Sequence, residues 1–239
     1  SKIFHHAIDA ELIEVNPLSG LNYSKQRTID IKPLTEEGAF TFLDAAKDHE
    51  GGIFYPHFLT LLRTGMRIGE LLGLQWNDFD FENRQVTIQR HIYKGVLVEK
   101  TKNGTIRTVD LTPHLSETIK ALKREKQKDA LRSGVPFCKW CFTFGNRTNP
   151  MSPPVIRNAM LSILEKAGLP KMRVHNTRHS YATIRLLKGH DVGDVSYQLG
   201  HRSIKITFDC YVHWLPGKFK SQVDDLDMQP SATQAQPKK

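Results

Sequence analysis

Hydrophobic residues recur every three to four positions over most of the chain, the spacing that places them on one face of an α-helix. Capping and helix-breaking residues indicate where several of these helices begin or end. Thr35 is a good N-cap and is followed by two glutamates, whereas Gly65 and the pair Asn16-Pro17 are typical of a helix end. The pattern predicts helices over residues 2–12, 36–46, 56–62, 68–72, 115–131, 154–167, 178–188, 192–199 and 204–211.

One part of the chain shows the residue preferences of β-strands instead. Three runs, 85–92, 96–100 and 105–111, follow a predicted turn at 77–83. The second and third runs flank Asn103-Gly104, a dipeptide that strongly favours a tight hairpin. We therefore expect an α+β protein that is mainly helical, with a small antiparallel β-sheet on one side.

The charge balance narrows the choice of partner. The 239 residues include 34 Lys and Arg against 25 Asp and Glu, which gives a net charge of +9. This excess suits a protein that binds a polyanion such as DNA, although an ordinary basic surface would give the same balance. No apolar run approaches the ~18 residues of a membrane span, so we expect no membrane partner.

The three cysteines are too few for a disulfide framework, which favours a cytoplasmic location. Cys138 and Cys141 have the spacing of half a zinc site, but no second pair of Cys or His completes four ligands. The neighbouring Phe137, Phe142 and Phe144 favour a buried strand. We therefore expect structural thiols and no metal site here.

Several residues suit the cleavage of a DNA phosphodiester without a metal. That reaction needs a nucleophile, cations for the charge on the non-bridging oxygens, and an acid for the leaving sugar oxygen. Arg67 follows a glycine at the start of a predicted helix, where its guanidinium and backbone N–H groups can meet one phosphate. His175 and Arg178, three residues apart, share one face of a helix.

Further along the chain, His201 stands beside a glycine and Tyr211 ends the last predicted helix. His175 and His179 also have the spacing of two zinc ligands, but a third ligand is not evident. Taken singly, each of these residues is more typical of a helix cap, a core position or the surface.

Four strings, taken in order, resemble the boxes of the tyrosine recombinase, or phage integrase, family. They are Thr64-Gly-Met-Arg67-Ile-Gly-Glu-Leu, His175-x-x-Arg178-His179, Leu199-Gly-His201 and Thr207-x-x-x-Tyr211. The resemblance implies the tyrosine-recombinase catalytic fold over residues 34–223. It also implies that residues 1–20 hold the last helix of a truncated core-binding domain. Composition predicts a basic linker at 21–33 and a disordered tail at 224–239.

The resemblance implies a role for each motif residue. Arg67 and Arg178 would clamp the scissile phosphate, and His201 would brace it. His175 would hydrogen-bond the same phosphate and assist proton transfer. Tyr211 would attack phosphorus to leave a 3′-phosphotyrosyl bond and a free 5′-hydroxyl. The bond energy stays in that link, so neither ATP nor another cofactor is expected.

The family also places a lysine on a β-hairpin as the general acid for the leaving oxygen. Lys102, next to Asn103-Gly104, stands where that lysine is expected, with Lys100 as a nearby alternative. Glu70 and His179 match supporting positions, although ordinary ion-pair and core roles suit them equally well. Contacts with flanking DNA phosphates are expected from Lys100, Arg107, Arg173, Arg202 and Lys205.

The function implied by the resemblance is site-specific DNA recombination, the integration or excision of a mobile element. The expected partners are double-stranded attachment sites, other protomers in a synaptic tetramer, and accessory DNA-bending or directionality proteins. Two alternatives stay open. A type IB topoisomerase would use similar chemistry to relax DNA, and a non-catalytic DNA-binding regulator would use the positive charge without any chemistry at Tyr211.

Overall fold

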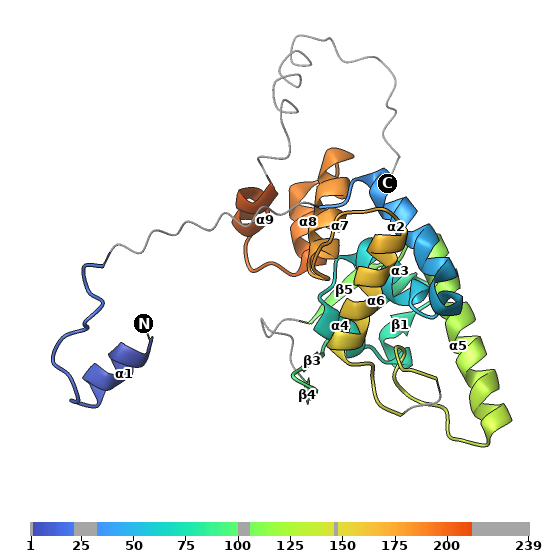
Figure 1. Ribbon diagram of the computed structural model, residues 1–239, viewed down its shortest axis with the longest axis horizontal. Coiled ribbons are helices and arrows are strands. Elements are labelled where there is room, and N and C mark those ends of the chain that lie inside the picture. Colours follow the sequence, from blue (N-terminus) through green and yellow to red (C-terminus); the bar gives the residue numbers. More distant parts are fainter. Residues whose placement is uncertain (1, 22–32, 100–105, 146–147, 212–239) are drawn as a thin grey trace, which may run out of the picture. The chain divides into compact units, whose positions relative to one another are not determined.

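The computed structural model describes residues 2–21, 33–99, 106–145 and 148–211. The chain separates into two units, Ser1–Ile31 and Lys32–Lys239. The first contains a short helix, α1 (Lys2–Asp9), which ends before the predicted residue 12 (Figure 1). The predicted linker, apart from residues 21 and 33, and the whole predicted tail lie outside the described residues. The assignment of these segments to domains stays a prediction.

The second unit is mainly helical, and the ends of its α-helices lie at the predicted positions or within about two residues of them. The Thr35 Oγ1 accepts a hydrogen bond from the Gly38 N–H at 3.1 Å and so caps α2 (Glu36–Asp48). Gly65 ends α3 (Tyr55–Thr64) with a left-handed φ of 64°. The remaining α-helices in the described residues are α4 (Ile68–Leu72), α5 (Pro113–Ser133), α6 (Pro153–Lys166), α7 (Asn176–Leu187), α8 (Val192–Leu199) and α9 (Ile204–Tyr211). No helix among the described residues is both long and apolar enough to cross a membrane.

The described strands form two small antiparallel sheets, which differ from the predicted arrangement. The run predicted over 85–92 is divided at Gln89 and Arg90, whose side chains both bind Asp78, at 2.7 and 2.6 Å. The described strands are β1 (Phe79–Asp80), β2 (Gln85–Ile88), β3 (His91–Tyr93), β4 (Val96–Val98) and β5 (Arg107–Asp110).

The pairing of the second and third predicted runs across Asn103-Gly104 is wrong for the described residues. β5 pairs with β2, with Val86 opposite Val109, and β4 pairs with β3. The three-stranded sheet therefore has the order β1-β2-β5. The dipeptide itself lies outside the described residues.

The expected buried strand around the cysteines is also incorrect. Cys141 and Phe142 are fully buried, but Phe137 and Phe144 are 39% and 45% exposed. In the part of this segment that the structure describes, isolated bridges, one of them between Trp140 and Gln75, take the place of a continuous strand.

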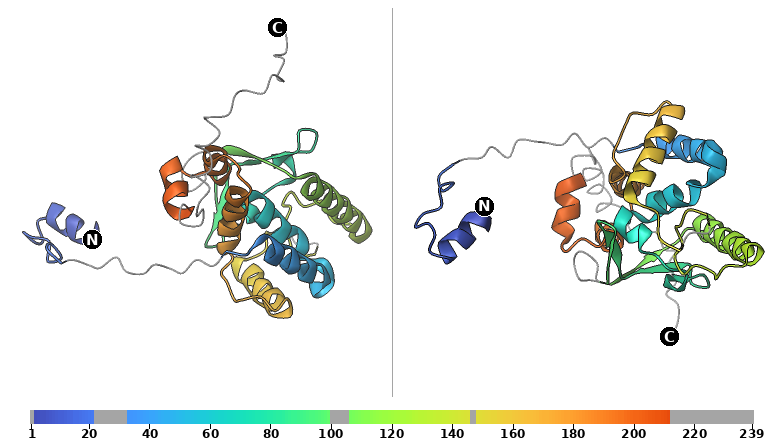
Figure 2. Two further views of the ribbon diagram at one scale, coloured as in Figure 1. Left: turned by 90° about the horizontal axis from the view of Figure 1, so that it is seen from above. Right: turned by 60° about the horizontal axis from the view of Figure 1, so that its bottom comes forward.

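Among its described residues, the second unit has two hydrophobic clusters. In the larger one, Phe42 of α2 and Phe58 of α3 meet edge to face, with ring centroids 5.1 Å apart. The smaller one joins α7, α8 and α9, which lie together in Figures 1 and 2, and it includes Tyr181, Leu199 and Tyr211. α3 packs on α7, α7 packs on α8, and α8 packs on α9. These contacts bring the motif that follows α3 and the last described helix, α9, to the same region.

Candidate active site

One buried carboxylate holds two of the arginines. Arg67 stands directly before α4, where its N–H donates to Glu70 Oε2 and its Nη1 donates to Glu70 Oε1, both at 2.9 Å. Arg107 of β5 donates its two terminal nitrogens to the same carboxylate at 3.1 and 2.8 Å. Since Glu70 is only 1% exposed, both guanidinium groups are fixed by a contact that water cannot easily replace.

These contacts keep Glu70 ionised. Burial alone would raise the pKa of this carboxyl group, but the hydrogen bonds and charge of Arg107, together with those of Arg67, outweigh it. The net effect lowers the pKa to about 2.

The burial of Arg107 corrects our expectation that it contacts a flanking phosphate. The residue is 5% exposed, and its Nε donates to the carbonyl oxygen of Gln198 at 3.0 Å. A Cβ at Gly200 would lie 2.9 Å from the Arg107 side chain, so the backbone passes close to it. Arg107 therefore joins β5 to Glu70 and to the end of α8, and it does not face solvent.

Arg178 of α7 provides a third guanidinium, which is buried like that of Arg107. It is 2% exposed, and its Nη1 donates to the Gly65 carbonyl oxygen at 2.9 Å, whereas its Nη2 is buried with no hydrogen-bond partner among the described residues. Burial, followed by the positive charge of Arg67, lowers the pKa of Arg178 to about 9. A buried, unpaired donor among other cations favours the binding of an anionic oxygen.

His201 lies in the turn between α8 and α9, half-buried beside these arginines. Its Nδ1 is 2.7 Å from Thr207 Oγ1. Burial and the positive charges of Arg178 and Arg67 lower the pKa of His201 to about 4, so its imidazole is neutral at pH 7. A neutral imidazole at this position can hydrogen-bond a bound phosphate.

Tyr211 reaches the same region from the end of α9. It is 3% exposed, and its Oη lies 2.8 Å from Nδ1 of His179. Burial raises the pKa of the phenol, an effect that the nearby charge of Arg178 opposes. His175, at the start of α7, is exposed, and its ring meets the edge of the His179 ring with centroids 5.1 Å apart.

The other expected site residues lie in different surroundings. Lys100 and Lys102 are outside the described residues. Arg173, Arg202 and Lys205 are exposed, and Lys205 Nζ is 4.0 Å from Asp209 Oδ2. Their contacts with DNA stay predictions.

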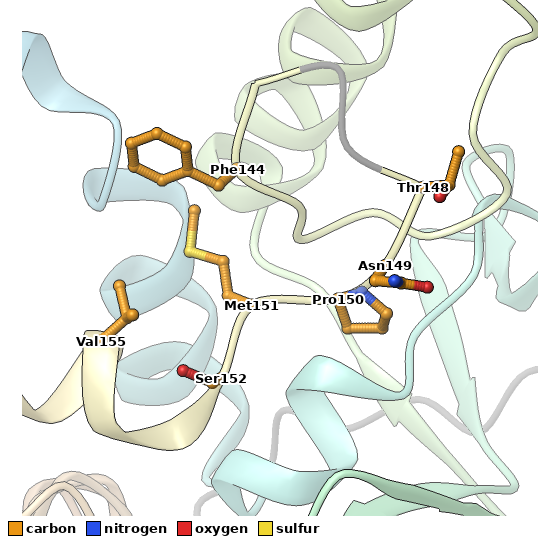
Figure 3. A pocket seen from close by; sticks show the side chains of 7 residues that line it. All are labelled: Phe144, Thr148, Asn149, Pro150, Met151, Ser152 and Val155. Atoms are coloured by element: carbon orange, nitrogen blue, oxygen red, sulfur yellow. The ribbon is translucent and has the colours of Figure 1, made fainter.

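The pocket in Figure 3 lies apart from the expected catalytic residues that the structure describes. An open pocket of about 640 Å³ on the second unit is lined by residues between Phe144 and Val155, including Met151 (Figure 3). Of the expected catalytic residues that the structure describes, none lines it. The arginines and Tyr211 instead form a compact polar cluster, which suits a small charged group better than a large apolar ligand.

The geometry places the guanidinium groups of Arg67 and Arg178 in the same region as His201 and Tyr211. Residues 32–217 match the profile of the phage integrase family, and the chain belongs to that family. It is 30% identical to the tyrosine recombinase XerC-like protein of Caldanaerobacter subterraneus subsp. tengcongensis, over 94% of this chain and 62% of that protein. It is 25% identical to the ICEBs1 integrase of Bacillus subtilis, over 95% of this chain and 62% of that protein.

The chain therefore spans less than two thirds of the length of these relatives. Among solved structures, it resembles the Tn1549 transposon integrase in complex with a circular intermediate DNA. The TM-score is 0.77 with 24% identity, over 94% of this chain and 76% of that chain. This likeness shows that the fold is that of an integrase.

Proposed function

We propose that this chain is the DNA-cleaving part of a site-specific recombinase of a mobile element. The observation that supports this most directly is the convergence of Arg67, Arg178, His201 and Tyr211 from four separate segments. The charges of Arg67 and Arg178 both act on His201, and the charge of Arg178 also acts on Tyr211, so these groups lie within electrostatic reach of one another.

In the proposed reaction, a phosphodiester binds with its non-bridging oxygens on Arg67 and Arg178. The buried Nη2 of Arg178 has no hydrogen-bond partner in the part of the chain that the structure describes, and the Arg67 side chain is 26% exposed, so both can bind an incoming anion. His201 donates a further hydrogen bond to the same phosphate. These donors are held in place before the reaction and stabilise the charge of the transition state.

Tyr211 then attacks phosphorus, and the 5′-oxygen leaves with its electron pair. The product is a 3′-phosphotyrosyl bond and a 5′-hydroxyl, which attacks the corresponding link in a partner duplex to rejoin the strands. Lys102 is our proposed acid for the leaving oxygen, with Lys100 as the alternative. The reaction exchanges one phosphodiester for another, so it needs no external energy source.

The proposed partners follow from this chemistry. Strand exchange requires two double-stranded attachment sites and a tetramer of protomers. The net charge of +9 and the DNA bound to the Tn1549 integrase support a DNA partner. Accessory DNA-bending or directionality proteins and a cytoplasmic location are part of the same proposal.

A suicide substrate tests the function. Nicked duplexes with a randomised core are incubated with the full chain, and protein-linked DNA is recovered under denaturing conditions and sequenced. We expect covalent adducts that Tyr211→Phe abolishes. The matched control, Tyr197→Phe, removes the hydroxyl of an exposed tyrosine on α8 and should leave adduct formation unchanged.

The same preparation distinguishes the alternatives. Joining of the trapped strand to a second duplex supports recombination. Relaxation of supercoiled DNA without strand exchange would instead support a topoisomerase. Sequence-specific binding with no adduct would overturn the catalytic proposal in favour of a regulator.

A further inference from the structure

The nucleophile candidate is in contact with a histidine that the sequence motifs associate only with a supporting role. Tyr211 Oη lies 2.8 Å from Nδ1 of His179, and the two ring centroids are 5.7 Å apart. The family resemblance instead connects proton transfer with His175, which is exposed at the start of α7. The histidine in contact with Tyr211 Oη is therefore His179 and not His175.

The protonation states of the two groups decide which proton transfers are open to them. Burial raises the pKa of the Tyr211 phenol, so the hydroxyl keeps its proton at neutral pH. Burial, together with electrostatic repulsion from His175 and Arg178, lowers the pKa of His179 to about 4. A neutral imidazole that accepts at Nδ1 carries its proton on Nε2. In that tautomer, the phenol donates and the imidazole accepts.

Both partners belong to well-packed helices. His179 lies on α7 between Arg178 and Ser180, and Ser180 Oγ accepts a hydrogen bond from the Leu34 N–H at 2.8 Å. On the other side, Tyr211 packs into the cluster that joins α7, α8 and α9. A contact between two packed helices holds the donor and acceptor atoms more accurately than a contact between loops.

We propose that His179 accepts the proton of Tyr211 during DNA cleavage, an inference that rests on the proposed function. As the bond from Oη to phosphorus forms, the O–H bond of the phenol breaks and the proton moves to Nδ1 of His179. The 5′-oxygen leaves with its electron pair and takes a proton from a separate acid. In the joining step, a 5′-hydroxyl attacks phosphorus and gives its proton to the conjugate base of that acid. The phosphotyrosyl bond breaks, and the imidazolium returns its proton to Tyr211.

The charges around His179 link this step to substrate binding. His175 and Arg178 on α7, and His201 before α9, surround the ring with groups that are positive or can become so. They disfavour the imidazolium in the protein without DNA. A phosphodiester bound by Arg178 adds a negative charge, which offsets this repulsion and favours proton transfer. Tyr211 therefore stays protonated until DNA occupies the site.

The test uses single-turnover cleavage of the trapped suicide substrate across a range of pH. His179→Asn keeps a hydrogen-bond acceptor near the position of Nδ1 but cannot take up a proton. We expect DNA affinity within about twofold of the wild type and cleavage slower by about 10²- to 10⁴-fold. The rate of the variant should also rise with pH where that of the wild type is level.

A second tyrosine–histidine pair provides the control. Tyr55 Oη lies 2.7 Å from Nε2 of His114 at an exposed position on other elements. His114→Gln removes a similar contact and should change neither the rate nor its pH profile. If His179→Asn cleaves like the wild type, the inference is wrong. The same holds if His175→Gln alone changes the pH profile.

A spectroscopic measurement avoids any folding defect of the variant. Nitrogen NMR of the histidine-labelled full chain at pH 7 should show His179 neutral, protonated at Nε2 and hydrogen-bonded at Nδ1. Tyr211→Phe should shift the Nδ1 signal. A proton on Nδ1 would make His179 the donor and overturn the inference. If the wild type forms no adduct at all, the proposed function fails, whatever the tautomer of His179.

Discussion

Glu70 shows how one side chain can determine the geometry of the site. Its two oxygens bind Arg67 and Arg107, and all three groups are largely removed from water. Removing one partner of a buried ion pair leaves an uncompensated charge, which costs more than the pair contributes. Here two guanidinium groups depend on one carboxylate.

We therefore expect Glu70→Gln to lower the free energy of unfolding at pH 7 by about 3–5 kcal/mol, measured by urea denaturation. The amide keeps the shape but not the charge, so Arg67 and Arg107 repel each other. The control is Glu117→Gln, which removes an exposed partner of Lys120 and should leave the unfolding curve unchanged. Equal shifts in the two variants would show that Glu70 is not a structural anchor.

The pH dependence of this difference gives an independent check. The pKa of Glu70 is lowered from 4.5 to about 2, so its contribution is complete above pH 4.5 and is lost as pH falls through 2. The wild type and Glu70→Gln should therefore converge in stability over that range. A constant difference down to pH 2 would contradict the assigned pKa.

At the scale of residues, the sequence predicted which side chains form the site but not all of their contacts. The motifs indicate Arg67, Arg178, His201 and Tyr211, and the structure brings these residues together. The contacts of Arg107 and His179 were not predicted, because each depends on which element lies opposite. Arg107 is 37 positions from Glu70, and Tyr211 is 32 positions from His179.

At the scale of elements, Gly65 joins the end of α3 to the arginine site. Its φ is 64°, and a Cβ there would lie 2.4 Å from Tyr181 on α7 and 2.8 Å from Leu199 on α8. Its carbonyl oxygen accepts the hydrogen bond from Arg178. Helix termination, helix packing and the position of a guanidinium therefore depend on the same residue.

Gly65→Ala should lower the free energy of unfolding by roughly 3 kcal/mol or more, from the left-handed backbone and the crowding together. Gly134→Ala is a matched control, since it also follows a helix with φ of 63° but has no described atom within 4 Å of the added Cβ. Its loss should be about 1–2 kcal/mol. Adduct formation should fall only in Gly65→Ala. If the two variants lose similar amounts of stability and of adduct formation, the packing around Gly65 does not explain the effect.

Helices and strands were predictable to different degrees. The periodicity and the caps at Thr35 and Gly65 are local, so they indicate most helices of the second unit within a few residues. Strand partners are not local. The pairing of β5 with β2 places Val109 against Val86 in the core. No turn signal in the sequence predicts that β5 pairs with β2.

At the scale of the whole molecule, positive charge is expected to attract DNA through exposed residues. Arg202→Gln should weaken non-specific DNA binding about equally for all sequences. It should also reduce the slope of log affinity against log salt by about one, the effect of one lost phosphate contact. Fluorescence anisotropy at several salt concentrations measures both quantities.

The control for this prediction is Arg132→Gln on α5, which lies across the second unit from α9 in Figures 1 and 2. Arg132 is also exposed, so both variants lose the same net charge. If the two changes reduce the salt slope equally, binding reflects total charge and not the face that carries Arg202.

The core of the second unit contains a histidine whose titration affects folding as a whole. His57 of α3 is 3% exposed, and its ring centroid is 4.7 Å from that of Phe142. Burial, with a smaller effect of the positive charge of Lys126, lowers the pKa of His57 from 6.5 to about 3. The folded protein therefore disfavours the charged imidazole, whereas the unfolded chain accepts a proton below pH 6.5.

This difference predicts a loss of stability on acidification. The wild type should lose up to about 5 kcal/mol of unfolding free energy, relative to His57→Leu, as pH falls from 6.5 to 3, with no further loss below. Leucine fills a similar volume and cannot titrate. Urea denaturation of both proteins at several pH values gives the difference directly, and His114→Gln should follow the wild type. Parallel curves for the wild type and His57→Leu would mean that His57 does not resist protonation in the fold, so acid sensitivity would have to come from other groups.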